Sequence, residues 1–397
     1  MQGSPKNSKK TEAKIPPVKK NVKKRKRSKK EKLLRGLLIA FSVLVILALL
    51  VWGIYHAILD YYLNKINIVT QETGLHFETA PLTEEITGEQ QTGEEPFTEE
   101  IVITDETASL PLIANNKDVT NILLLATDTR LDNQAGRSDV MMMVSVNEKT
   151  GKIVLCSFLR DLYAKFPETP KNPIYSGKGY DKLTHAHAYG GPELTMAVLK
   201  ETFNVEVEHY AKVNFYSFAH AIDALGGVDL YLTEAEVNYI NNYMINQQVE
   251  PNVKENLGIT GSVSLGTAKD GMYHLNGAMA LTHARNRSSA GSDFDRTQRQ
   301  RNIITAMLKK ASSLSLSQMN SALNTVLPMI TTNMPKSMLR DLVNNALSYV
   351  KYDVESTRIP LNGTYTSQSY NLVPDLDVNC NHLYRLIYGE EPPTQKK

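Results

Sequence analysis

From about residue 119 onward, the hydrophobic positions of this chain form short apolar runs and amphipathic stretches. Apolar runs that end in polar residues predict buried strands at 119–130, 140–146, 152–158 and 228–232. The turn sequence NEKTG joins the second and third runs, which indicates a hairpin. Amphipathic segments predict helices at 193–203, 215–225, 276–285 and 296–312. Strands that alternate with helices are typical of a layered α/β domain.

One uninterrupted apolar segment near the N-terminus differs from these periodic patterns. Residues 37–55 read LLIAFSVLVILALLVWGIY, nineteen residues without charge or proline. A membrane-spanning helix needs roughly 20 such residues. No small-residue cleavage site follows, so we interpret 36–58 as a retained signal anchor and not as a removed signal peptide.

The net charge of +2 hides a strong asymmetry across this apolar segment. Residues 1–35 carry fifteen Lys and Arg against two acidic residues. This excess predicts a cytoplasmic N-terminal tail and an extracellular C-terminal part, in a single-pass protein of the cell membrane. A basic tail can also bind nucleic acid. Beside a membrane span, however, we expect it to set the topology and to contact anionic lipid headgroups.

The sequence after the span divides into an acidic segment and a longer mixed one. Residues 66–116 contain eleven acidic side chains and no Lys or Arg, which predicts a disordered extracellular linker over 59–116. Residues 117–391 are long enough for one sizeable domain, and 392–397 form a tail. Two cysteines occur, Cys156 and Cys380. Buried apolar thiols are favoured over a bridge, although the sequence leaves their pairing open.

Charged residues follow the ends of the expected strands. Asp128 and Asp139 are carboxylates without a Cys/His pattern beside them, which suits an oxygen-preferring cation such as Mg²⁺. Each could equally cap a turn or pair with Arg130 or Arg137. Arg160 follows the strand expected at 152–158, and Asp128 and Arg130 end the run 119–130. Polar groups are therefore expected at the C-terminal ends of these two strands.

Five arginines lie within one stretch of seventeen residues, although the chain as a whole is nearly neutral. A guanidinium is well shaped for two-point contact with phosphate oxygens. Arg285 and Arg287 reach the same side only in extended structure, which suggests a loop at the end of a helix. Arg296 and Gln300 share one helical face by their spacing. A solvated helix face paired with nearby aspartates is the alternative. The other two arginines are expected to be surface or structural: Arg299 and Arg301.

Other sequence patterns point to no further chemistry. The His185-x-His187 pair is a weak signal for a base or a metal site, and packing at a helix start is favoured. The sequence contains no G-x-S-x-G motif, no Walker-type glycine loop and no metal-type Cys/His spacing.

Seven sequence blocks, taken in order, resemble the LytR-CpsA-Psr (LCP) family of cell-envelope phosphotransferases. They are NILLLATDTR, GRSDVMMMVSVNEKTGKI, SFLRDLY, DKLTHAHAYGGPE, DALGGVDL, LNGAMALTHARNR and DFDRTQRQR. The resemblance covers roughly residues 120–304. It implies a single extracellular LCP-type α/β domain, with a mixed central sheet and helices on both faces, preceded by one transmembrane helix.

The resemblance also implies a function. Family members bind a polyprenyl-pyrophosphate-linked glycan, such as a teichoic acid precursor, and transfer its phosphoglycan part to a hydroxyl of peptidoglycan in cell-wall assembly. A pyrophosphatase with water as acceptor is the first alternative. A transcriptional attenuator is the second, but it would need a cytoplasmic DNA-binding module. The expected cytoplasmic tail has only about 35 lysine-rich residues.

Roles for individual residues follow from the resemblance by position. Asp128 and Asp139 match the family's Mg²⁺-associated aspartates, which implies an Mg²⁺-dependent phosphotransferase. Arg130 and Arg137 match arginines of the family's first two blocks, and Arg160, Arg285 and Arg287 match arginines that hold the pyrophosphate. All five are expected to bind the pyrophosphate. The D-x-x-R-x-x-x-Q part of the last block is matched by Asp293, Arg296 and Gln300. A carboxylate, Asp293 or another, is expected to accept the hydroxyl proton. An apolar trough for the polyprenyl chain is expected, with residues 194–203 and 215–225 as candidate walls, although the aliphatic stripes of these helices are more typical of plain core.

Overall fold

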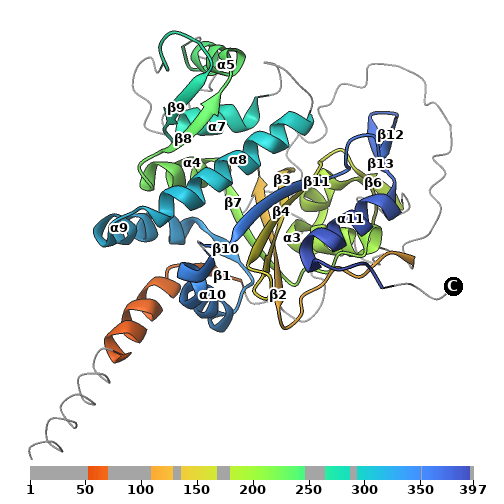
Figure 1. Cartoon of the computed structure of the whole chain (residues 1–397), viewed down its shortest axis with the longest axis horizontal. Helices are drawn as coiled ribbons and strands as arrows, with labels where there is room; N and C mark the ends of the chain where they lie inside the picture. Colours follow the sequence, from red (N-terminus) through yellow and green to blue (C-terminus); the bar gives the residue numbers. More distant parts are fainter. Residues whose placement is uncertain are drawn as a thin grey trace, which may run out of the picture. The chain divides into compact units, whose positions relative to one another are not determined.

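The computed structural model describes most of the chain beyond residue 51 (Figure 1). The described stretches are 52–69, 109–127, 136–167, 179–245, 264–286, 293–349 and 351–393. Two compact units are present, Met1–Ile58 and Leu59–Lys397. In the described part of the chain, no helix combines the length and the apolar character needed to cross a bilayer. Most of the predicted span 37–55 lies outside the described residues, so the membrane topology stays a prediction.

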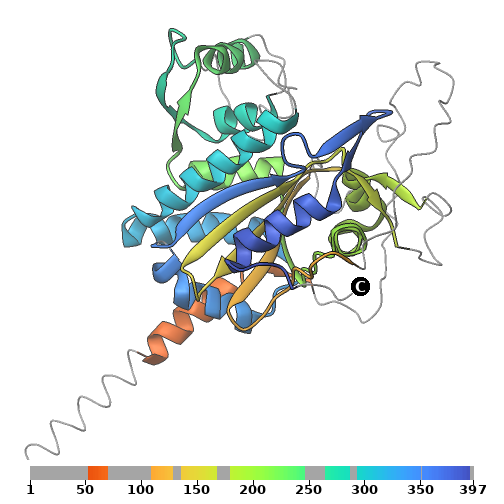
Figure 2. The same ribbon diagram turned by 45° about the vertical axis from the view of Figure 1, so that its right-hand side comes forward.

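A mixed seven-stranded sheet forms the centre of the larger unit (Figures 1 and 2). Its strand order is β1-β10-β7-β2-β3-β4-β11. The bounds are β1 Asn67–Ile68, β2 Val119–Thr127, β3 Ser138–Asn147, β4 Lys152–Phe158, β7 His209–Asn214, β10 Thr331–Thr332 and β11 Asp353–Ile359. Strand β3 is antiparallel to both β2 and β4, so β2 and β4 end at the same edge. The predicted α/β class and the predicted hairpin are confirmed.

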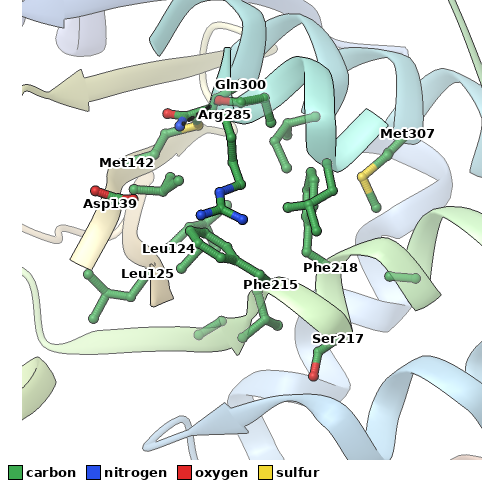
Figure 3. Close-up of a pocket in the computed structure, with 18 of the residues that line it drawn as sticks. Leu124, Leu125, Asp139, Met142, Phe215, Ser217, Phe218, Arg285, Gln300 and Met307 are labelled. Atoms are coloured by element: carbon green, nitrogen blue, oxygen red, sulfur yellow. Dashed lines mark hydrogen bonds between the residues drawn. The ribbon is translucent and has the colours of Figure 1, made fainter. Parts of the chain in front are cut away.

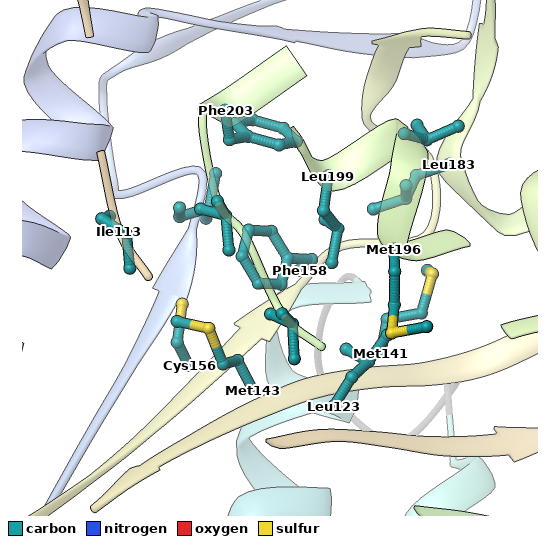
Figure 4. Packing of buried hydrophobic residues seen from close by; sticks show 14 of the residues in the cluster. Ile113, Leu123, Met141, Met143, Cys156, Phe158, Leu183, Met196, Leu199 and Phe203 are labelled. Atoms are coloured by element: carbon teal, nitrogen blue, oxygen red, sulfur yellow. The ribbon is translucent and has the colours of Figure 1, made fainter. Parts of the chain in front are cut away.

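Helices cover both faces of this sheet because successive side chains of each strand point to opposite sides. Met141 and Met143 of β3 join one apolar cluster with α3 and α11, and Figure 4 shows them opposite Leu199 and Phe203. Met142, between them, joins a different cluster with side chains of α8 and α10. The helices are α3 Leu183–Phe203, α4 Phe215–Ala224, α5 Glu234–Ile245, α7 Gly277–Arg285, α8 Asp293–Ser312, α9 Leu316–Val326, α10 Lys336–Tyr349 and α11 Leu376–Tyr388, with the short 3-10 helix η2 at Leu327–Met329.

Helix α3 begins ten residues earlier than the sequence predicted, and it is kinked at Gly190 and Gly191. Its first half carries His187, whose Nδ1 lies 2.8 Å from the carbonyl oxygen of Gly136. Burial, together with nearby Lys212, lowers the pKa of His187 to about 4, although the hydrogen bond with Gly136 opposes this shift. A buried, neutral histidine in this position confirms the interpretation as helix packing.

Both ends of the expected linker 59–116 belong to the folded unit. Leu59 and Leu63 lie in a buried cluster with side chains of α10, and β1 pairs in parallel with β10. At the other end, Ile113 is fully buried in the core shared with α3. The folded part therefore starts before residue 117. The acidic stretch 70–108 between these ends lies outside the described residues.

Smaller two-stranded sheets complete the described structure. Strand β8, Val228–Leu232, is confirmed, but it pairs with β9, Gly271–Leu275, outside the central sheet. The others are β5 Tyr163–Lys165 with β6 Tyr180–Lys182, and β12 Tyr365–Gln368 with β13 Asn371–Pro374. Cys156 and Cys380 are both buried free thiols, and burial raises the pKa of Cys156 to about 12. This confirms the favoured interpretation as apolar thiols.

Candidate active site

Charged side chains gather at the edge of the sheet where β2 and β4 end. Arg137 directly precedes β3 and Asp139 is its second residue, while Arg160 follows the last residue of β4 by two positions. Helix α8 begins at the same place, so its first turn adds Asp293 and Arg296. The β3–β4 hairpin and the distant helix α8 thus supply one polar site.

Ion pairs connect these side chains into one network. Arg160 lies between two of the aspartates, with Nη1 3.4 Å from Asp139 Oδ1 and Nε 3.6 Å from Asp293 Oδ1. Arg296 contacts the same two, at 3.0 Å from Asp293 Oδ2 and 3.7 Å from Asp139 Oδ1. Asp161 adds a third carboxylate, 3.5 Å from Arg160 Nε. Arg160 therefore contacts three carboxylates and Arg296 bridges two of them, which fixes the geometry of the group.

The network holds Arg160 in its charged form. Burial disfavours the charge, but Asp293, Asp161 and Asp139 together outweigh that cost and raise the pKa of Arg160 above its usual value. Arg296 is the most enclosed member, with only 2% of its side chain exposed, whereas Asp293 keeps 17% and Asp139 keeps 18%. The two arginines thus differ, because Arg296 lies behind the carboxylates and Arg160 is more open to a ligand.

A cavity of about 510 Å³ opens from this network (Figure 3). One end is lined by charged and polar side chains: Arg137, Asp139, Arg160, Arg285, Arg296 and Gln300. The rest of the wall is mainly apolar, and it includes Leu124, Phe215, Phe218, Ala221, Met307 and Ile330. Such a cavity suits a molecule with an anionic head and a long apolar tail.

Arg285 reaches the cavity from the last turn of α7. Arg285 is exposed, and its guanidinium carbon lies 4.9 Å from the centre of the Phe215 ring. Figure 3 shows the guanidinium beside this ring. A cation over an aromatic face gains roughly 0.5–1 kcal/mol at an exposed site. The ring therefore orients Arg285 while leaving its N–H groups available to an anion.

The sequence of the chain matches the model of the LytR_cpsA_psr family over residues 83–382. The chain belongs to this family.

Named relatives and solved structures agree with this membership. A relative from Oceanobacillus iheyensis, named polyisoprenyl-teichoic acid–peptidoglycan teichoic acid transferase TagU, is 28% identical over 287 residues, 69% of this chain and 78% of the relative. The TagT transferase of Bacillus subtilis is 34% identical over 203 residues, 50% of this chain and 55% of the relative.

Two solved structures share the fold. Protein gbs0355 from Streptococcus agalactiae superposes with a TM-score of 0.55 at 22% identity, covering 70% of this chain and 91% of that one. A structure described as TagT bound to LI-WTA gives a TM-score of 0.51 at 24% identity, covering 72% and 100%. At these identities the likeness shows that the mixed α/β architecture is common to the family.

Most of the residues that the sequence analysis selected lie together. Six of them line the cavity, and Asp293 contacts two of the six. Three lie outside the described residues, so their roles stay predictions: Asp128, Arg130 and Arg287. The sequence analysis did not include Asp161 in the site, although it directly follows Arg160 at the same strand end.

The apolar wall and the remaining arginines differ in part from expectation. Helix α4 lines the cavity as expected, through residues such as Phe215 and Phe218. Residues 194–203 follow the core alternative, because those side chains of α3 face the opposite side of the sheet and pack in the core. Arg299 and Arg301 are 6% and 2% exposed, so they are structural and not surface residues.

The oxygen donors at the charged end suit a divalent cation. Among the residues with described positions, no group of three or more His, Cys, Asp or Glu could hold a metal. Mg²⁺, however, is usually bound by one or two carboxylates together with water and substrate phosphates. Asp139 is a carboxylate on the cavity wall, beside arginines that would also face a substrate phosphate. Its chemistry therefore fits the predicted ion.

Proposed function

We propose that this chain is a phosphotransferase that moves a glycopolymer from a polyprenyl-pyrophosphate carrier to a hydroxyl of peptidoglycan. One observation carries the proposal: a single cavity combines an arginine-lined end with a long apolar wall. The names of the family relatives, which are teichoic acid–peptidoglycan transferases, support the same donor and acceptor. Teichoic acid is accordingly the glycopolymer that we expect.

The donor fits the cavity in one orientation. A pyrophosphate diester is anionic, so it belongs at the end that Arg137, Arg160 and Arg285 line. The polyprenyl chain then lies along the apolar wall, where each buried methylene contributes about 0.8 kcal/mol. This places the glycan at the open edge of the sheet, where a second substrate can approach the phosphorus.

The reaction that follows is a phosphoryl transfer. The acceptor hydroxyl attacks the phosphorus nearest the glycan, the bond from that phosphorus to the bridging oxygen breaks, and polyprenyl phosphate leaves. The hydroxyl proton passes to a carboxylate, for which Asp293 is the candidate in the described site. The protein contributes mainly by positioning the two substrates and by neutralising charge with its arginines.

A bound Mg²⁺ would offset further negative charge on the pyrophosphate. Asp139 and, by the family pattern, Asp128 are the residues that would hold the ion. Support comes from the hard oxygen chemistry of Asp139 and from its position on the cavity wall.

We also propose that the enzyme is anchored in the cell membrane, with residues 1–35 in the cytoplasm and the catalytic unit outside. The charge asymmetry across 37–55 supports this orientation. The polyprenyl phosphate product would then remain in the membrane that holds the enzyme. Protease added to intact protoplasts should remove the catalytic unit, and its protection alongside a cytoplasmic control protein would reverse the orientation.

Reconstitution with both substrates tests the activity. The full chain in detergent is incubated with Mg²⁺, a synthetic polyprenyl-pyrophosphate glycan and a peptidoglycan oligosaccharide. Mass spectrometry should detect polyprenyl monophosphate together with a phosphodiester-linked product. Release of polyprenyl monophosphate at the same rate without the oligosaccharide would support the pyrophosphatase alternative instead.

A further inference from the structure

A buried ion pair lies behind the cavity, on the side of α8 that faces α5 and α7. Arg299 of α8 donates from Nε to Glu236 Oε1 at 2.7 Å and from Nη1 to the carbonyl oxygen of Asn286 at 3.0 Å. Neither Arg299 nor Glu236 lines the cavity. Arg299 therefore connects helix α5 with the residue that directly follows α7.

Glu236 is itself held firmly at the start of α5. Its Oε2 accepts hydrogen bonds from the backbone N–H and the hydroxyl of Thr233, at 3.0 and 3.1 Å. Burial raises the pKa of Glu236, but the bonds from Arg299 and Thr233 outweigh burial and lower it overall. The carboxylate thus stays charged and fixed, so it can orient the Arg299 guanidinium.

The other end of this link is the backbone beside Arg285. Asn286 is completely buried and follows Arg285 directly, so a bond to its carbonyl oxygen restricts the last turn of α7. Gln300, next to Arg299, makes a longer contact of 3.5 Å with the carbonyl oxygen of Ala284. Helix α8 therefore contacts the backbone on both sides of Arg285, whose side chain enters the cavity over Phe215 (Figure 3).

We propose that Glu236 and Arg299 form a positioning pair that sets the direction of Arg285 for pyrophosphate recognition. The proposal rests on the proposed function, because it concerns the anionic head of that donor. The pair does not touch the substrate. Arg299 acts through the Asn286 carbonyl and thereby reduces the freedom that Arg285 would lose on binding.

The planar guanidinium is essential to this arrangement. Nε and Nη1 of Arg299 point to two different acceptors at once, one on α5 and one at the end of α7. A lysine ammonium is a point charge on a flexible stem, and it cannot reproduce that two-point geometry. Arg299→Lys should therefore keep a charge in the buried site but loosen the end of α7.

A double-mutant cycle tests the coupling between Arg299 and Arg285. The dissociation constant for a synthetic polyprenyl pyrophosphate is measured with the full chain, for Arg299→Lys, Arg285→Ala and the double variant. Arg299→Lys alone should weaken binding about tenfold, because charge-assisted hydrogen bonds to the ligand are lost or misaligned. In the Arg285→Ala background the same change should have less than about a twofold effect. Glu236→Gln should show the same coupling with a smaller loss.

Arg301→Lys is the matched control for a buried arginine of the same helix. Arg301 bonds to Gln298 within α8, and it makes no described hydrogen bond to α7. Its substitution should leave lipid affinity unchanged in both backgrounds. If Arg299→Lys weakened lipid binding equally in the presence and in the absence of Arg285, the pair would have only a general structural role. That result would overturn this proposal alone. A wild-type chain that binds no polyprenyl pyrophosphate would overturn the proposed function and this proposal with it.

Discussion

Replacing Arg296 by methionine tests how much this arginine contributes to the stability of the charged site, in addition to ligand binding. Arg296 is 2% exposed and bridges Asp293 and Asp139, so its removal takes one cation away from two carboxylates that also contact Arg160. Methionine fills a similar space with an unbranched apolar chain, which limits cavity effects. The expected consequence is a loss of folding free energy together with a loss of lipid binding.

The size of the loss follows from the contact distances. With an effective dielectric constant of about 20, the contacts at 3.0 and 3.7 Å are each worth roughly 5 kcal/mol before desolvation is subtracted. Removing one partner of a buried pair typically costs about 3–5 kcal/mol in net terms. Because the aspartates keep 17% and 18% of their side-chain surface, we expect the lower end, about 3 kcal/mol.

Urea unfolding followed by circular dichroism measures the change, with the slope of the transition checked for constancy. Arg285→Met is the matched control, because Arg285 lines the same cavity but is exposed and packs only on Phe215 in the described contacts. It should change the free energy of unfolding by no more than about 1 kcal/mol, the value of an exposed cation–π contact, while still weakening lipid binding. If Arg296→Met were as stable as Arg285→Met, the bridging role assigned to Arg296 would be wrong.

Three further predictions concern the cavity wall, the metal and pH. Ala221→Phe should weaken binding of a long-chain donor roughly tenfold but spare a short-chain analogue, since displaced methylenes are worth about 0.8 kcal/mol each; equal effects on both donors in calorimetry would contradict this. Asp139→Asn should abolish Mg²⁺-stimulated turnover without changing the circular dichroism spectrum, and full activity would place the ion elsewhere. Burial lowers the pKa of His187 from 6.5 to about 4, so stability present above pH 6.5 should decline as the pH falls through 4. Urea titrations at pH 7 and pH 4 give the difference in the free energy of unfolding between the two pH values, and His187→Gln should reduce this difference by up to roughly 3 kcal/mol. An unchanged difference would contradict the prediction.

Local patterns were sufficient to predict the part of the fold that carries the site. The β3–β4 hairpin has a strong turn signal, and the sequence analysis placed Asp139 and Arg160 at strand ends, where the structure pairs them. The family resemblance added Asp293 and Arg296 to the same site, which the ion pairs bear out as a spatial group.

Long-range packing explains what the sequence did not predict. Arg299 was expected to be surface or structural, and only the fold shows which, because its charge is paired with Glu236, sixty-three positions away. Leu59 and Leu63 lie beside an acidic stretch, and only their packing against α10 shows that this segment is folded. The strand β8 was predicted correctly, but its partner β9 and its place outside the main sheet depend on tertiary contacts.

The choice between transfer and hydrolysis is the most direct test of the account. The reconstituted reaction is run in ¹⁸O-labelled water with donor, acceptor and Mg²⁺, and the phosphate in the glycan product is examined by mass spectrometry. If the acceptor hydroxyl attacks the phosphorus, the phosphodiester-linked product forms and its phosphate contains no ¹⁸O. Release of a free glycan phosphate that carries one ¹⁸O, with no linked product, would show that water is the acceptor and would contradict the proposed transferase.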